Sequence, residues 1–174
     1  QKLYSTEMAL YAGDEFDVSE KLSINYGLRF PVFIVSGKTY SFVEPRITAK
    51  LSAGSDASIK ASYTKMNQFL HLIPNSTAGL PTDIWIPSSN KTKPQSSTQY
   101  AVGYFRNFKD NAIETSVEIY YKNMDNQVLF GEGKQLKINV NLDSLIVYGN
   151  GKSYGAEFFV KKNTGQLTGW ISYT

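Results

Sequence analysis

The residues able to do covalent or metal chemistry are few in this sequence. There is no cysteine and a single histidine, His71, which excludes a thiolate or histidine-rich metal site within the chain. The adjacent carboxylates Asp14 and Glu15 flank no recognisable nucleophile or base, which a hydrolase would need. The sequence therefore predicts a protein that is not an enzyme and that carries no metal or cofactor.

A glycine-rich stretch at 149–153 (GNGKS) resembles the end of a phosphate-binding loop. The full pattern needs a glycine five residues before Gly151, where Ile146 stands, and no helical pattern follows. We expect instead a loop that enters a strand, with glycines supplying unusual backbone angles.

The segment 71–97 is a long connection that contains four prolines together with His71, Asp83 and Trp85. A structureless loop of this length is uncommon unless it is functional. We therefore predict ligand contacts at His71, Asp83 and Trp85. Two alternatives stay open: His71 is a hydrogen-bonded structural residue, or Trp85 and the prolines fold the loop onto itself.

Composition narrows the class of protein. The formal net charge is +3, with both signs spread along the chain, which is not the clustered basic face of a nucleic-acid binder. Aromatic residues make up 14% while the mean hydropathy is −0.30, which suits β-structure whose two faces meet different solvents. No apolar run approaches the roughly 20 residues of a membrane helix. The chain opens at Gln1 and stops within a strand-like pattern, so we expect a piece of a longer protein.

Alternation of apolar and polar residues with period two dominates the sequence. Val43, Ile47 and Leu51 share one face of a strand, and Glu44 and Lys50 share the other. Repeated between turn signals, this pattern predicts about eight antiparallel strands. They are expected near 8–18, 22–30, 43–53, 58–64, 99–104, 113–122, 156–161 and 167–173.

The predicted connections alternate in length, with tight turns near residues 19, 55, 110 and 164. Longer connections fall at 34–42, 71–97 and 130–150, and outer-membrane barrels have this rhythm of short periplasmic turns and long extracellular loops. The strands are long, and a wide, wet interior tolerates the charges on their polar face.

The sequence favours an up-and-down transmembrane β-barrel segment. The alternative is a self-contained soluble β-sandwich or small β-barrel with a binding role, in which the apolar face would be a dry core. Aromatic residues near the strand ends are expected to form interfacial girdles in the membrane. They are Phe30, Tyr63, Tyr104, Tyr121 and Tyr173.

Several segments together resemble the barrels of TonB-dependent receptors. The segments 10–16 (LYAGDEF) and 22–29 (LSINYGLR) are similar to a strand pair of that family, and 44–46 (EPR) to the start of its next strand. The segments 80–85 (LPTDIW) and 154–158 (YGAEF) look like forms found in receptors of Bacteroidetes-type bacteria. The resemblance covers essentially the whole chain.

The resemblance implies a 22-stranded barrel in the bacterial outer membrane, of which residues 1–174 are a partial segment that lacks the plug. It implies import of a nutrient, such as a siderophore, a glycan or a peptide. The implied partners are the TonB energy-coupling complex acting through the plug, outer-membrane lipid and a surface lipoprotein, with no nucleic acid.

Overall fold

The structure is a computed structural model that describes residues 4–73, 84–130 and 146–174. Every element in these ranges is a strand, as the sequence predicts, and no helix within them is long and apolar enough to cross a membrane. The strands are β1 (Ser5–Ser19), β2 (Leu22–Val35), β3 (Lys38–Ser41), β4 (Glu44–Ser52), β5 (Ala57–Gln68), β6 (Leu70–Ile73), β7 (Ile84–Pro87), β8 (Gln95–Phe108), β9 (Ile113–Phe130), β10 (Ile146–Lys162) and β11 (Gly169–Tyr173).

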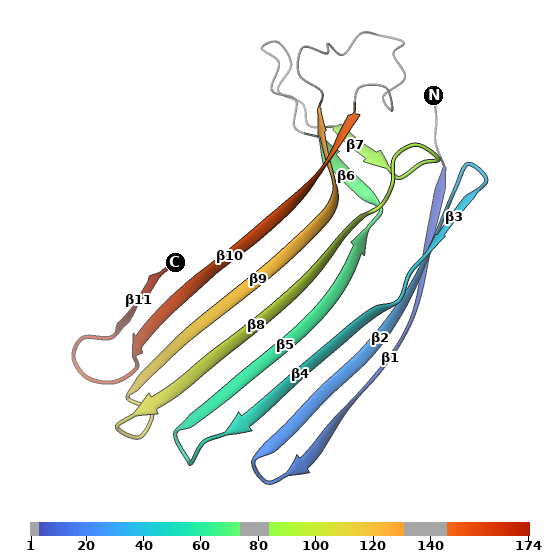
Figure 1. Ribbon diagram of the computed structural model, residues 1–174. Coiled ribbons are helices and arrows are strands. Elements are labelled where there is room, and N and C mark those ends of the chain that lie inside the picture. Colours follow the sequence, from blue (N-terminus) through green and yellow to red (C-terminus); the bar gives the residue numbers. More distant parts are fainter. Residues whose placement is uncertain (1–3, 74–83, 131–145) are drawn as a thin grey trace.

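One open antiparallel sheet contains most of the strands, in the order β1-β2-β4-β5-β8-β9-β10-β11, with β3 paired to β2 (Figure 1). These eight strands correspond to the eight that the sequence predicts. Strands β6 and β7 form a separate two-stranded sheet. Short turns lie at one end of the large sheet and the longer connections at the other, which confirms the predicted rhythm (Figure 1).

The strands are long enough to cross a bilayer. Strands β2 and β8 have 14 residues, β10 has 17 and β9 has 18, against the roughly 9–11 residues of a tilted transmembrane strand. The surplus in β9 and β10 extends beyond the sheet's neighbouring strands at the long-loop end (Figure 1).

The register of the sheet puts the apolar residues on one face. Directly paired residues share a face, and one row of such pairs contains many tyrosines. Ile47 and Ile119 on this face are 46% and 61% exposed, whereas the core of a soluble β-domain would bury them. Asp14 on the edge strand β1 is a charged exception, because it pairs with Tyr26. The row runs through Tyr26, Ile47, Tyr63, Tyr100, Tyr121 and Tyr154.

The opposite face is polar and charged. Lys50 pairs with Lys60, and Glu118 pairs with Glu157, so two like-charge pairs stand in one row across the sheet. Gly103 lies between them, since it pairs with Lys60 on one side and with Glu118 on the other. Like charges directly opposite one another repel, and such a row is stable where water can screen it.

Glycines on the polar face make room for large neighbours. A Cβ at Gly103 would lie 2.8 Å from the Phe105 ring, and a Cβ at Gly155 would lie 3.0 Å from the Tyr120 ring. Atoms of each ring therefore lie close to the glycine, in space that a Cβ would need. The Lys60 ammonium lies 4.4 Å from the centroid of the Phe105 ring, which adds a cation–π contact.

A small apolar cluster lies at the long-loop end. Phe33 and Val35 of β2 are buried with Phe69, and the rings of Phe33 and Phe69 stack at 4.8 Å between centroids. Tyr40 and Phe42 pack against this cluster. It ties the β2–β3 hairpin to the chain that leaves β5.

The structure corrects three expectations about the longer connections. Segment 34–42 is the β2–β3 hairpin, turned by Ser36 and Gly37 with φ of 44° and 78°, a combination that suits a tight hairpin turn. Segment 71–97 is not structureless, because its described part contains β6 and β7. Segment 149–153 lies within β10 at a bulge, and its glycines are absent from the residues with positive φ, so they do not supply unusual backbone angles.

Candidate ligand-binding cleft

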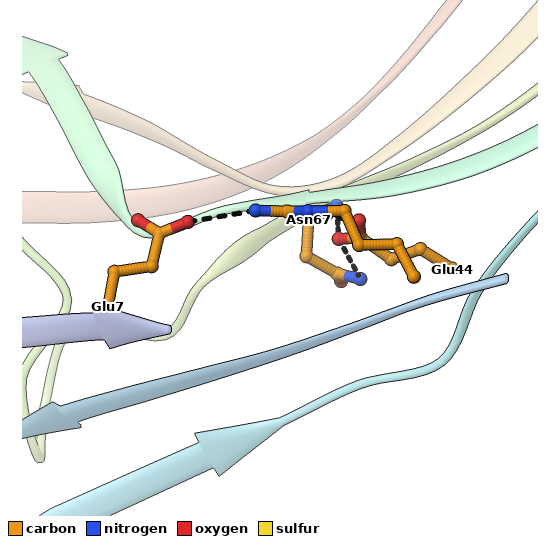
Figure 2. Close-up of polar contacts among 4 residues, drawn as sticks. Glu7, Glu44 and Asn67 are labelled. Atoms are coloured by element: carbon orange, nitrogen blue, oxygen red, sulfur yellow. Dashed lines mark hydrogen bonds and ion pairs between the residues drawn. The ribbon is translucent and has the colours of Figure 1, made fainter. Parts of the chain in front are cut away.

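A buried carboxylate organises the long-loop end of the sheet (Figure 2). Glu44 at the start of β4 is 1% exposed and accepts a hydrogen bond of 2.8 Å from Arg29 Nη1 on β2. The backbone N–H and the side-chain amide of Asn67 on β5 donate to its other oxygen, at 2.7 and 3.2 Å. Arg29 Nη2 in turn donates to Glu7 on β1 at 3.1 Å. One network thereby joins four strands.

The network fixes where the chain goes after β5. The backbone N–H of Asn67 donates to a side chain of β4, which draws the end of β5 toward the polar side chains of β2 and β4. Phe69 then packs on Phe33, as described above. As a result the following β6–β7 hairpin is held beside the polar face.

A cleft of about 480 Å³ opens beside this network. Its lining combines three charged residues, several amides and hydroxyls, two methionines and two aromatic rings. Trp85 of β7 is 63% exposed, so its ring is available to a ligand. Such a mixture of apolar surface with a few placed polar groups is typical of small-molecule sites. The lining residues are Glu7, Arg29, Met66, Asn67, Gln68, Phe69, Leu70, Trp85, Gln95, Ser96, Ser97, Lys122, Met124 and Gln127.

His71 has a structural environment. It is fully buried, and its Nε2 shares a hydrogen bond of 2.9 Å with Ser88 Oγ. Burial lowers the pKa of His71 to about 4 from 6.5, so the imidazole is neutral near pH 7. His71 is absent from the cleft lining, and its contacts fit the structural alternative left open by the sequence.

Two tyrosines hold the segment that follows β7. The Tyr40 hydroxyl of β3 donates to the carbonyl of Ser89 at 2.7 Å, and the Tyr148 hydroxyl of β10 donates to the carbonyl of Lys91 at 2.6 Å. The N–H of Lys93 donates back to Tyr148 at 3.2 Å. Burial and then the neighbouring Tyr148 raise the pKa of Tyr40, which keeps it a neutral donor. These hydrogen bonds from Tyr40 and Tyr148 hold the segment that follows β7, and with it Trp85 beside the cleft.

Of the three residues predicted from the sequence, only Trp85 is placed in the cleft. Asp83 lies outside the described residues. The sequence did not identify Glu7, Arg29 and Lys122 as site residues; Glu7 and Arg29 lie on the neighbouring strands β1 and β2, and Lys122 lies far along the chain on β9. Alternation puts Arg29 and Lys122 on the polar side of their strands, but nothing in one sequence shows which strands meet at the cleft.

The long strands, the exposed apolar face and the charged opposite face together define a wall segment of a membrane β-barrel. The whole chain, residues 1–174, matches the family model described as TonB dependent receptor-like, beta-barrel. The chain therefore belongs to the TonB-dependent receptor family, whose members are outer-membrane proteins of Gram-negative bacteria. A comparison with curated proteins gives no match.

Solved structures share the fold at low sequence identity. The FrpB iron transporter from Neisseria meningitidis (F3-3 variant) is similar at 17% identity and a TM-score of 0.69, over 98% of this chain and 25% of that one. The ferric-catecholate import receptor Fiu from E. coli K12 is similar at 13% identity and a TM-score of 0.63, over 97% of this chain and 28% of that one. The pyoverdine receptor FpvA from Pseudomonas aeruginosa PAO1 is similar at 17% identity and a TM-score of 0.63, over 97% of this chain and 25% of that one. The chain thus spans about a quarter of the length of these receptors.

Proposed function

We propose that this chain forms part of the wall and of the external ligand cleft of a TonB-dependent nutrient importer. The observation that carries the proposal is the cleft at the long-loop end, which is the extracellular end in outer-membrane barrels. It lies on the polar face, where a ligand would enter the barrel. Binding there is non-covalent, through Trp85 and the amide side chains, and the protein is not an enzyme.

The roles that we propose for Trp85 and His71 rest on their surroundings. Trp85 supplies an aromatic surface for the ligand, and Asp83, two residues before it, is proposed as a second ligand contact. His71 acts indirectly, because its hydrogen bond to Ser88 supports the hairpin that carries Trp85. The imported ligand is a siderophore, glycan, peptide or similar nutrient. Ferric siderophores are the first probes to use, since the similar structures named above include iron and pyoverdine receptors.

The rest of the machinery lies outside this chain. We propose that residues 1–174 are a segment of a 22-stranded barrel of the Bacteroidetes-type form. A plug within it would couple to the TonB complex, and a surface lipoprotein would assist capture of the ligand. The rival hypothesis of a soluble β-domain requires Ile47, Val117 and Ile119 to be packed inside, yet all three are at least 38% exposed.

Uptake by cells that make the full-length receptor tests the proposal. The probes are a ferric catecholate and a ferric pyoverdine, with a neutral oligosaccharide as a third probe. Import of at least one probe should depend on the proton-motive force. Trp85→Ala should lower it about tenfold or more, because a well-packed aromatic contact contributes about 2 kcal/mol or more to binding.

Trp170→Ala is the matched control, because Trp170 is similarly exposed at 66% but belongs to β11 near the short-turn end. Both variants should reach the outer membrane at wild-type levels. Recovery of the full-length protein in the soluble fraction without detergent would refute the proposal. So would equal uptake by the Trp85→Ala and Trp170→Ala cells.

A further inference from the structure

One face of the β6–β7 hairpin is apolar and exposed. Leu72 pairs with Trp85, and Leu70 lies two residues before Leu72, so the three side chains share a face. They are 45% (Leu70), 40% (Leu72) and 63% (Trp85) exposed. The opposite face, with His71 paired to Ile86, is buried. An apolar surface is thus held in solvent at the long-loop end (Figure 1), and such a surface is typical of a contact site.

The hairpin also has an unpaired backbone edge along β6. Within the described residues, β6 is hydrogen-bonded to β7 alone. The N–H of Ser88 donates to the carbonyl of Phe69 at 2.7 Å, so Phe69 and Ser88 form a hydrogen-bonded pair. Such pairs alternate along an antiparallel ladder. The N–H and C=O groups of Leu70 and Leu72 therefore point away from β7, where a further strand could pair with them.

One acceptor of this edge is already bound by an amide group. Gln68 Nε2 donates to the carbonyl of Leu70 at 2.6 Å. The side-chain amide of Gln68 thus takes the place that the N–H of an adjoining strand would have. Gln68, Leu70 and Trp85 all line the cleft, so the edge borders the space open to a ligand. A free edge beside an apolar face is what strand addition requires, since the edge binds backbone groups and the face binds alternate side chains.

We propose that the ligand of this cleft is an extended peptide that adds to β6 as a third, antiparallel strand. The inference rests on the proposed function and names the ligand class within it. The peptide takes the Leu70 carbonyl over from Gln68 and pairs with the N–H and C=O of Leu72. Peptide residues opposite Leu70 and Leu72 put their side chains on the face of Trp85, because directly paired residues share a face. Every second side chain of the peptide is therefore apolar.

Binding of a synthetic hexapeptide to the detergent-purified full-length receptor tests the backbone contacts. The probe alternates leucine and serine. In the antiparallel arrangement, the leucines opposite Leu70 and Leu72 donate their own N–H groups to β6. Methylation of the leucine nitrogens should therefore weaken binding about 30-fold, the equivalent of two hydrogen bonds of about 1 kcal/mol each. Methylation of the serine nitrogens is the matched control and should leave the affinity nearly unchanged, because these N–H groups point away from β6.

Leu72→Pro tests the same edge from the side of the receptor. Proline removes the outward N–H of Leu72, on which no hydrogen bond to β7 depends. Leu72→Pro should weaken hexapeptide binding about fivefold more than Leu72→Ala, which keeps the N–H. Gln68→Ala should tighten binding, because the amide that competes for the Leu70 carbonyl is removed.

Three results would overturn the proposal of strand addition. They are absence of hexapeptide binding to the wild type, equal weakening by the two methylated peptides, and equal affinity of Leu72→Pro and Leu72→Ala. If Leu72→Pro does not fold, Gln68→Ala still decides from the side of the receptor, since unchanged or weaker binding contradicts the proposal. A receptor that imports a ferric probe through Trp85 but binds no peptide would keep the proposed function and lose this inference.

Discussion

Replacement of Glu44 by glutamine is the sharpest test of how the cleft is held. The carboxylate accepts three hydrogen bonds from Arg29 and Asn67 through its two oxygens. Glutamine has almost the same shape but turns one acceptor into a donor. Its NH2 group must then face either the guanidinium of Arg29 or the backbone N–H of Asn67, both of which are donors themselves.

The expected loss can be worked from these contacts. Breaking a buried ion pair by removal of one partner costs about 3–5 kcal/mol. The lower end of that range applies here, because the Arg29 side chain is 30% exposed and keeps its second partner, Glu7. We therefore expect Glu44→Gln to lower the free energy of local opening by about 3 kcal/mol. That loss corresponds to exchange of the Asn67 amide hydrogen that is roughly 100-fold faster.

Hydrogen exchange of the full-length receptor in lipid vesicles measures this effect. Faster exchange should be confined to the end of β5 and to the β6–β7 hairpin, with β9 unchanged. Glu7→Gln is the control, because the Glu7 side chain is 42% exposed and a surface pair contributes about 1 kcal/mol or less. Exchange at Asn67 that is no faster in Glu44→Gln than in Glu7→Gln would refute the reasoning.

Three further predictions concern other parts of the sheet. His71 is neutral when folded, with its pKa lowered to about 4; the unfolded hairpin, with an ordinary pKa near 6.5, binds the proton more tightly. The β6–β7 hairpin should therefore keep its full stability above pH 6.5 and lose up to about 3 kcal/mol as the pH falls to 4. The loss should be measured as faster hydrogen exchange of the hairpin at low pH. In the His71→Gln variant the stability of the hairpin should not depend on pH in this range. Val117→Arg on the apolar face should destabilise the receptor by up to about 2–4 kcal/mol in urea unfolding from vesicles, and Ser116→Arg on the polar face by less than about 1 kcal/mol; equal losses would contradict the assignment of faces. Gly103→Val should cost about 1–3 kcal/mol, because its Cβ would lie 2.8 Å from the Phe105 ring and 2.9 Å from Glu118 Cγ; Phe105→Ala should remove part of this cost and leave the part due to Glu118, and an undiminished loss in the double variant would contradict the role of the ring.

Much of the sheet could be predicted because alternation is a local signal. Ile47 and Lys50 were assigned to opposite faces from period two alone, and the register confirms both positions. The predicted girdle residues Phe30, Tyr104, Tyr121 and Tyr173 are exposed, and the pairings put them on the apolar face. Tight turns at the short-loop end followed from local turn residues, since a turn is fixed by its own few residues.

The cleft could not be predicted, because it depends on side-chain contacts between residues that are more than 20 positions apart. Glu44 and Asn67 are 23 residues apart in the sequence, and Arg29 and Glu7 are 22 apart. The β6–β7 hairpin was missed because each of its strands has four residues, too few for a period to stand out among prolines. The sequence predicts that this strand begins at Ala156, whereas β10 begins at Ile146. The bulge near Asn150 interrupts the alternation, and the glycines suggested a loop.

The close contacts at Gly103 and Gly155 concern the polar face more than the pairing of the strands. A methyl group placed at Gly103 would lie 2.8 Å from the Phe105 ring, and one placed at Gly155 would lie 3.0 Å from the Tyr120 ring. Each ring would then have to move away from the backbone. How far these two aromatic side chains stand out from the charged face is therefore set by two positions that have no side chain.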